Sequence, residues 1–310
     1  MYKLKLARNH LPSTFLPQYR SFSASHHHKP ARLHHMAIPS KNKDSPDLVN
    51  LVVLHGLLGS SSNFQSILKN HKISSQANTF LLDLRNHGAS EHKDTMTFPE
   101  MSHDVYHFIQ ENNLQSNLVL LAHSFGARIG MNFAMQYPEV LKGIIIVDMA
   151  PYNYHADQRF GFTKITHKML QNLLEIDLNL GYDKVIEAVK LAVPTQDTLG
   201  LIVRNLESND KGEVKWKVNL KTIFENYLDM QKTVPQPGHK GKYNGPIKII
   251  CGEKSDYVSQ DILVNFHNIF DGLDMSKDVE IVKDAGHWLH HQKPHEFINI
   301  VANFLQSIKK

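Results

Sequence analysis

Short apolar runs separated by polar stretches recur along the body of the chain. Six of them are nearly continuous and bounded by turn residues: Asn50–His55, Thr79–Leu84, Leu118–Ala122, Gly143–Asp148, Ile247–Cys251 and Val279–Val282. A strand with one exposed face would alternate apolar and polar residues, whereas a continuous run is typical of a strand buried on both faces of a parallel sheet. The six runs therefore predict a sheet that is covered by helices on both sides.

The segments between these runs have apolar residues at helical spacing. Pro99 and Glu100 are suited to open one helix, and Pro138 is suited to close another. The pattern predicts helices over five ranges: 63–70, 99–113, 126–137, 260–270 and 294–308. Repeated alternation of strand and helix predicts an α/β fold with a mostly parallel, doubly wound sheet.

Residues 152–245 interrupt this alternation. They contain no strand run of the same kind, and their apolar spacing predicts several helices, for example over 161–175 and 181–193. We interpret the segment as a helical cap inserted into a sheet domain. That domain comprises residues 31–151 and 246–310.

The basic residues are concentrated at the N-terminus. Residues 1–43 hold eight of the 34 Lys and Arg residues and none of the 30 Asp and Glu residues. A basic, Ser-containing leader without a continuous apolar stretch has the composition of a mitochondrial transit peptide, which we place at residues 1–30. The rest of the chain has an excess of acidic residues, which argues against nucleic-acid binding by the folded part.

The composition also excludes several other classes of protein. A single Cys excludes an intramolecular disulfide framework and a Cys-based zinc or iron–sulfur site. No run approaches the roughly 18–20 consecutive apolar residues that a transmembrane helix needs. We therefore expect no transmembrane segment. The sequence also implies no metal or organic cofactor.

The most informative motif follows the strand that ends at Ala122. That strand leads directly to Ser124, and a helix is expected to begin immediately after it. Small residues surround the serine, with Ala122 two positions before it and Gly126 and Ala127 after it. A nucleophilic serine on a sharp turn between strand and helix requires such small neighbours. Ala122 departs from the commoner glycine at its position only by a methyl group.

A second turn follows the strand that ends at Leu54. In His55-Gly56-Leu57, the glycine allows the backbone to turn and expose N–H groups. The backbone amides of Leu57 and Phe125 are the predicted oxyanion hole. The polar turn that begins at Asp83 and Arg85 is expected to tie loops together near this site.

A histidine for general-base catalysis is expected at His287, on the loop after the last strand. From there it could reach back over the sheet to Ser124 and remove the hydroxyl proton. The neighbouring His290 and His291 are expected at the surface. The acid is ambiguous, because Asp148 and Asp256 both follow strands and both lie between the serine and the histidine in chain order.

Five motifs, taken in chain order, resemble the α/β-hydrolase superfamily over roughly residues 31–308. They are strand-HGLLGS, DLRNHG-S, AHSFG-A, IIIVDMAP and AGHW. The second and fourth motifs are similar, more narrowly, to the mitochondrial abhydrolase-domain group, related bacterial short-chain acyl esterases and fungal ethanol acetyltransferases. In that group the acid closes the strand after the nucleophile helix, which implies Asp148. Asp256 matches the acid position of the wider superfamily and stays the alternative.

The expected function is that of a mitochondrial serine acyl hydrolase or acyltransferase. It would act on small-molecule esters or thioesters through an acyl-Ser124 intermediate. The fungal resemblance implies acetyl-CoA as a possible donor substrate and ethanol as an acceptor. The alternatives are a carboxylesterase, a lipase-type or carbon–carbon bond hydrolase without transferase activity, and a non-catalytic scaffold. Epoxide hydrolysis on this fold needs an Asp at the position of Ser124.

Overall fold

A computed structural model describes residues 29–42, 47–232, 234 and 241–309. Within these residues the main sheet has seven strands in the order β1-β3-β2-β4-β5-β8-β9. All neighbouring strands are parallel except β1, which is antiparallel to β3. The strands are β1 (His35–Ile38), β2 (Val49–Leu54), β3 (Ala77–Leu82), β4 (Leu118–His123), β5 (Leu141–Val147), β8 (Ile247–Gly252) and β9 (Val279–Val282).

The expected α/β fold with a mostly parallel sheet is confirmed, and the six predicted runs coincide with the six parallel strands to within two residues. The edge strand β1 was not among them. It is only four residues long and contains a histidine and an exposed alanine, so its sequence lacks a continuous apolar run.

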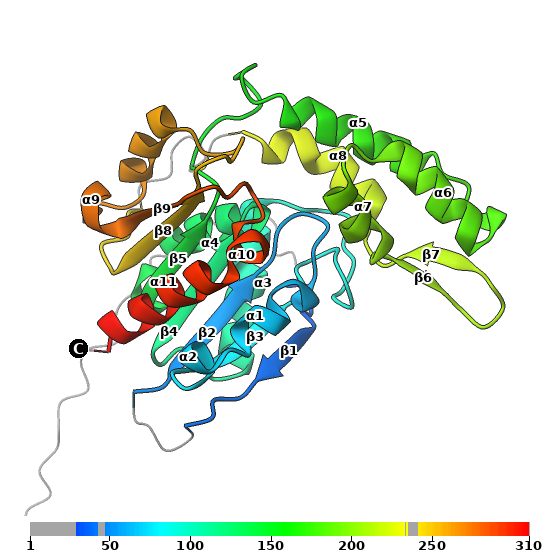
Figure 1. Cartoon of the computed structure of the whole chain (residues 1–310). Helices are drawn as coiled ribbons and strands as arrows, with labels where there is room; N and C mark the ends of the chain where they lie inside the picture. Colours follow the sequence, from blue (N-terminus) through cyan, green and yellow to red (C-terminus); the bar gives the residue numbers. More distant parts are fainter. Residues whose placement is uncertain (1–28, 43–46, 233, 235–240, 310) are drawn as a thin grey trace, which may run out of the picture.

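Helices cover both faces of the sheet (Figure 1). Alternate residues of one strand face opposite layers, as in β4, where Leu118 and Leu120 pack with one cluster and Val119 and Leu121 with the other. The first cluster includes apolar residues of α3 (Phe98–Glu111) and α4 (Phe125–Gln136). The second includes α1 (Gln65–Leu68), α2 (His71–Ser74) and α11 (Pro294–Ser307). Both faces are buried, which explains the continuous apolar runs.

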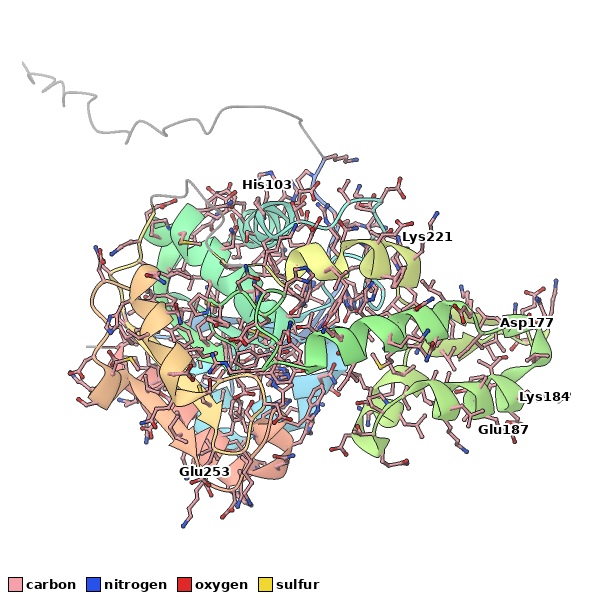
Figure 2. All side chains as sticks on the ribbon, turned by 90° about the horizontal axis from the view of Figure 1, so that it is seen from above. His103, Asp177, Lys184, Glu187, Lys221 and Glu253 are labelled. Carbon is pink, nitrogen blue, oxygen red and sulfur yellow. The ribbon has the colours of Figure 1, made fainter. Side chains whose placement is uncertain are left out.

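Between β5 and β8 the chain forms α5 (Phe162–Leu174), η3 (Leu178–Leu180), α6 (Tyr182–Ala192), α7 (Gln196–Val203) and α8 (Leu220–Met230). These helices lie at one end of the sheet (Figure 1). In the view from above, the part that carries Asp177, Lys184 and Glu187 extends sideways beyond the sheet (Figure 2).

The segment 152–245 also contains a hairpin that was not predicted. Strands β6 (Leu206–Ser208) and β7 (Val214–Trp216) pair antiparallel, and the turn between them includes Gly212 at φ 79°. The segment is therefore mainly helical, as the sequence predicts, with one short hairpin in addition. Three-residue strands with charged members give no periodic signal that sequence inspection could detect.

The remaining elements are short: η1 (Ser61–Phe64), η2 (Pro138–Val140), η4 (Gln260–Asn268), α9 (Met275–Asp278) and α10 (Leu289–Gln292). The predicted helix over 63–70 is thus divided between η1 and α1, and the one over 260–270 is a 3₁₀ segment. In the part of the chain that the structure describes, none of the helices combines the length and apolar character needed to cross a bilayer.

Candidate active site

The turn between β4 and α4 holds Ser124 in a strained conformation, at φ 54° and ψ −120°. Gly126, two positions after the serine, is required by close backbone packing. A Cβ added to Gly126 would lie 2.6 Å from the carbonyl oxygens of Leu54 and His55. A Cβ added to Gly130, one turn later, would lie 2.9 Å from the methyl group of Ala122. The helix therefore packs tightly against β4, and the serine stands at the carboxyl end of that strand.

Three side chains predicted from separate motifs meet at this edge of the sheet. His287 Nε2 lies 2.8 Å from Ser124 Oγ, and His287 Nδ1 lies 2.7 Å from Asp148 Oδ2. The chain positions are 163 and 139 residues apart, so only the fold brings them together. The serine hydroxyl can donate to Nε2 while the Nδ1–H donates to the carboxylate, which is the arrangement that general-base activation of a serine requires.

Asp148 is fully buried and adopts φ 52° directly after β5. Its Oδ1 accepts a hydrogen bond of 3.0 Å from the amide of Gly252, and its Oδ2 accepts from the hydroxyl of Ser255. Ser255 was not singled out in the sequence, because nothing in its local pattern distinguishes it from other loop serines. These donors compensate for burial of the carboxylate and fix the oxygen that faces His287.

Asp256, the alternative acid, directly follows Ser255 in the sequence but lies in a different environment from Asp148. It is exposed at the rim of the cavity described below. Among the described residues, the carboxylate that hydrogen-bonds to His287 is that of Asp148 and not that of Asp256. The geometry therefore places Asp148, rather than Asp256, in line with the histidine and the serine.

The two residues predicted to supply oxyanion amides, Leu57 and Phe125, both line the same cavity as Ser124 and His287. Phe125 is the first residue of α4, so its N–H has no acceptor within the helix. The next amide along the other loop, that of Leu58, is turned elsewhere and donates to His87 Nε2 at 3.1 Å. Leu58 adopts φ 59°, which reverses the chain directly after Leu57.

Two buried histidines, His55 and His87, fix the loop that follows β2. His55 Nε2 accepts from the amide of Leu84 at 3.0 Å, so its Nδ1 carries the proton and donates to the carbonyl of Gly56 at 2.7 Å. His87 is arranged in the same way, with Nδ1 donating to the carbonyl of Arg85 at 2.8 Å. Burial lowers the pKa of both rings, for His87 to about 3. Both therefore act as neutral connectors.

We expect His87 to make folding sensitive to acid. Its folded-state pKa of about 3 lies below the ordinary 6.5, so the unfolded chain binds the proton first as the pH falls. The associated stability is present above pH 6.5 and is lost towards pH 3. His87 should account for about 2 kcal/mol of the fall in the free energy of unfolding between pH 7.5 and pH 5. That fall should therefore be smaller by this amount in His87→Gln than in the wild type. Urea denaturation at both pH values measures this, with exposed His295→Gln as control; identical pH dependence in the two variants would contradict it.

The polar turn after β3 ties loops together, as expected. Asp83 accepts hydrogen bonds from the amides of Ser61 at 2.6 Å and Ala89 at 2.9 Å. Arg85 forms a buried ion pair with Asp104, with Nε 2.7 Å from Oδ2. These contacts connect the loops after β2 and β3 to α3.

The expectation of a surface position was wrong for His290. Its ring is fully buried and stacks on Phe64 with 4.4 Å between ring centroids. It also contacts His123, whose Nε2–H donates to the carbonyl of His287 at 3.1 Å. Sequence inspection could not detect this, since a polar residue beside two other histidines looks like a surface segment. His291 is exposed, as expected.

Ser124 and His287 open into a cavity of about 390 Å³. The helices between β5 and β8 supply part of its wall, including the apolar side chains of Phe162, Met169 and Leu201, and α4 and the loops after β2, β8 and β9 supply further lining residues. A second cavity of about 870 Å³, beside hairpin β6–β7, is larger but includes neither Ser124 nor His287. The smaller cavity is therefore the candidate binding site. Within residues 29–42, 47–232, 234 and 241–309, no group of three or more His, Cys, Asp or Glu side chains is arranged to hold a metal ion.

Known proteins resemble this chain over most of its length. A family model described as the alpha/beta hydrolase fold matches residues 49–294. The sn-1-specific diacylglycerol lipase ABHD11 of Xenopus laevis is 32% identical over 263 residues, which cover 83% of this chain and 80% of that protein. Ethanol acetyltransferase 1 of Cyberlindnera jadinii is 25% identical over 278 residues, covering 83% and 80% respectively.

A solved structure described as a marine microorganism esterase is similar in fold as well as in sequence. It superimposes with a TM-score of 0.79 at 27% identity, over 88% of this chain and 99% of that one.

Proposed function

Because this chain belongs to the α/β hydrolase fold family, we propose that Ser124, His287 and Asp148 form a catalytic triad that cleaves carboxylic esters or thioesters. One observation carries this proposal: the continuous hydrogen-bond chain from Ser124 Oγ through both ring nitrogens of His287 to the buried Asp148 carboxylate. Esterase and lipase relatives support the same reaction class.

In the proposed mechanism, Ser124 Oγ attacks the substrate carbonyl while His287 Nε2 takes its proton. Asp148 holds the imidazole in the tautomer that leaves Nε2 free to accept. The amides of Leu57 and Phe125 would donate to the negatively charged oxygen of the tetrahedral intermediate. The leaving alcohol or thiol departs with the proton held by His287, and an acyl-Ser124 ester remains.

Water completes a hydrolase cycle, whereas an alcohol completes a transferase cycle from the same acyl-enzyme. The mostly apolar cavity suits an acyl chain and would limit access of water. Similarity to the diacylglycerol lipases supports ester hydrolysis, which we propose as the main activity. Similarity to ethanol acetyltransferase 1 supports, at lower identity, acetyl transfer to ethanol as a second activity, for which we propose acetyl-CoA as the donor.

A mitochondrial location belongs to this proposal. It is supported by the composition of the leader, residues 1–28 of which lie outside the described residues. Import of the full-length chain into isolated mitochondria, compared with a chain that begins at residue 31, would test it.

The proposed function predicts that the full-length protein hydrolyses short p-nitrophenyl esters and that Ser124→Ala does not. With acetyl-CoA and increasing ethanol, gas chromatography would follow ethyl acetate and acetate together. Ethyl acetate that rises at the expense of acetate would support the transferase activity. Formation of acetate alone would support hydrolysis without transfer to ethanol. A protein that turns over none of these substrates and is not labelled at Ser124 by a fluorophosphonate would contradict the proposal.

A further inference from the structure

Arg128 lies on α4, one helical turn after Ser124, and is only 1% exposed. Residues four apart share one face of a helix, and helical side chains tilt towards the helix N-terminus. The Arg128 side chain therefore extends back towards the serine. It lines the same 390 Å³ cavity as Ser124 and His287.

The hydrogen-bond partners of this guanidinium are neutral. Nη1 donates to the carbonyl of Tyr152 at 3.3 Å, and Nη2 donates to the carbonyl of Lys232. The faces of Phe98 and Tyr154 lie 5.4 and 5.6 Å from the guanidinium carbon. Nε has no hydrogen-bond acceptor among the described residues.

No carboxylate balances this buried charge within the described structure. Asp148 is engaged by Gly252, Ser255 and His287, and Arg128 forms none of the ion pairs found there. The acids that flank the two segments bonded to Arg128 are engaged by other cations: Asp157 bonds to Arg159, and Asp229 bonds to Lys232 Nζ. Burial lowers the pKa of Arg128 to about 10, which leaves it protonated at neutral pH.

A buried cation without a counterion is strongly unfavourable, so such a group in a binding cavity is expected to meet an anion there. The planar donor edge of a guanidinium matches carboxylates and phosphates, and of these two anions the carboxylate is the one that an acyl chain itself can carry. The other carboxylates on the cavity wall, Asp197 and Asp256, are exposed side chains. They would not compete for the buried position.

We propose that Arg128 binds a carboxylate on the acyl part of the substrate, so that the preferred substrates are hemiesters or hemithioesters of dicarboxylic acids. The inference rests on the proposed serine hydrolase function and specifies its substrate class. The guanidinium is covered in this structure, so the carboxylate would displace the side chains around it before the Nε–H and a remaining Nη hydrogen donate to its two oxygens. Four residues of helix separate Arg128 from Ser124 by about 6 Å along the axis, so the acyl chain between the two groups is a few carbons long.

The test compares monoethyl adipate with ethyl hexanoate, which have the same acyl length and leaving group but differ in the terminal carboxylate. The full-length protein should have the higher kcat/KM for monoethyl adipate. In Arg128→Gln the ratio of the two kcat/KM values should fall by roughly 10²–10³-fold, and Arg128→Lys should restore part of it. Release of ethanol, measured by a coupled assay, gives both constants.

A binding measurement separates recognition from folding. Adipate titrated calorimetrically into Ser124→Ala should bind, and binding should be lost in the Ser124→Ala/Arg128→Gln double variant. A wild-type preference for ethyl hexanoate would overturn the inference, as would equal losses for both esters in Arg128→Gln and Arg128→Lys, since a purely structural arginine predicts equal losses. A preference seen only for the hexanoate ester of glycolic acid would overturn the acyl-side assignment. Failure of the proposed function itself is distinct: neither ester would be cleaved and Ser124 would not be labelled.

Discussion

Ser124→Ala should lower kcat for ester hydrolysis by a factor on the order of 10⁴–10⁶, and His287→Ala should have a loss of similar size. The reason is the 2.8 Å contact between Ser124 Oγ and His287 Nε2, through which the two side chains act as one unit. The double variant should therefore be scarcely less active than either single variant, because removing one partner already abolishes activation of the nucleophile.

Single-turnover and steady-state kinetics with p-nitrophenyl butyrate would measure this loss, and circular dichroism would establish that each variant is folded. Exposed residues provide matched controls: Ser116→Ala for the serine and His295→Ala for the histidine. Both controls should retain the wild-type kcat. A folded Ser124→Ala or His287→Ala variant with substantial activity would refute the triad.

Asp148→Asn should lower kcat by a factor on the order of 10⁴, whereas Asp256→Asn should lower it by less than tenfold. Asp148 Oδ2 accepts the proton of His287 Nδ1 at 2.7 Å, and an amide in its place could present an N–H that favours the wrong tautomer. Asp256 is exposed, and the carboxylate bonded to His287 is that of Asp148.

The comparison must be made at matched folding, because Asp148 also accepts from the amide of Gly252 and the hydroxyl of Ser255. Thermal unfolding of both variants would provide that reference, and activity would be measured well below the lower midpoint. A larger kinetic loss for Asp256→Asn than for Asp148→Asn would reverse the assignment of the acid.

The sheet, Ser124 and His287 could be predicted from local signals in the sequence, whereas Asp148 was implied by the resemblance to a family. Parallel strands buried on both faces have continuous apolar runs, and a nucleophilic serine on a tight turn needs small neighbours such as Gly126. Position alone could not distinguish Asp148 from Asp256, since both follow strands that end at the same edge of the sheet. Three-dimensional packing separates them: β5 adjoins β4 directly, whereas β8 is one strand further away.

Other features depend on contacts between distant residues and leave no local signal. Ser255 bonds to Asp148 across 107 positions, and Arg128 bonds to the carbonyl of Lys232 across 104. His290 is buried because Phe64 and His123 surround it, although its own sequence neighbours are polar. The three-residue strands of the β6–β7 hairpin are stabilised by each other and not by an intrinsic pattern.

The position of Arg128 has a mechanical consequence. Its two terminal nitrogens bond to backbone carbonyls at Tyr152 and Lys232, one near each end of the segment that leaves the sheet after β5 and returns before β8. Both ends are therefore fastened to the helix that carries Ser124. A rigid displacement of the intervening helices would stretch both of these hydrogen bonds, together with others such as that from Asn205 Nδ2 to the carbonyl of Leu58, so the ease with which the cavity opens is coupled to what the guanidinium holds.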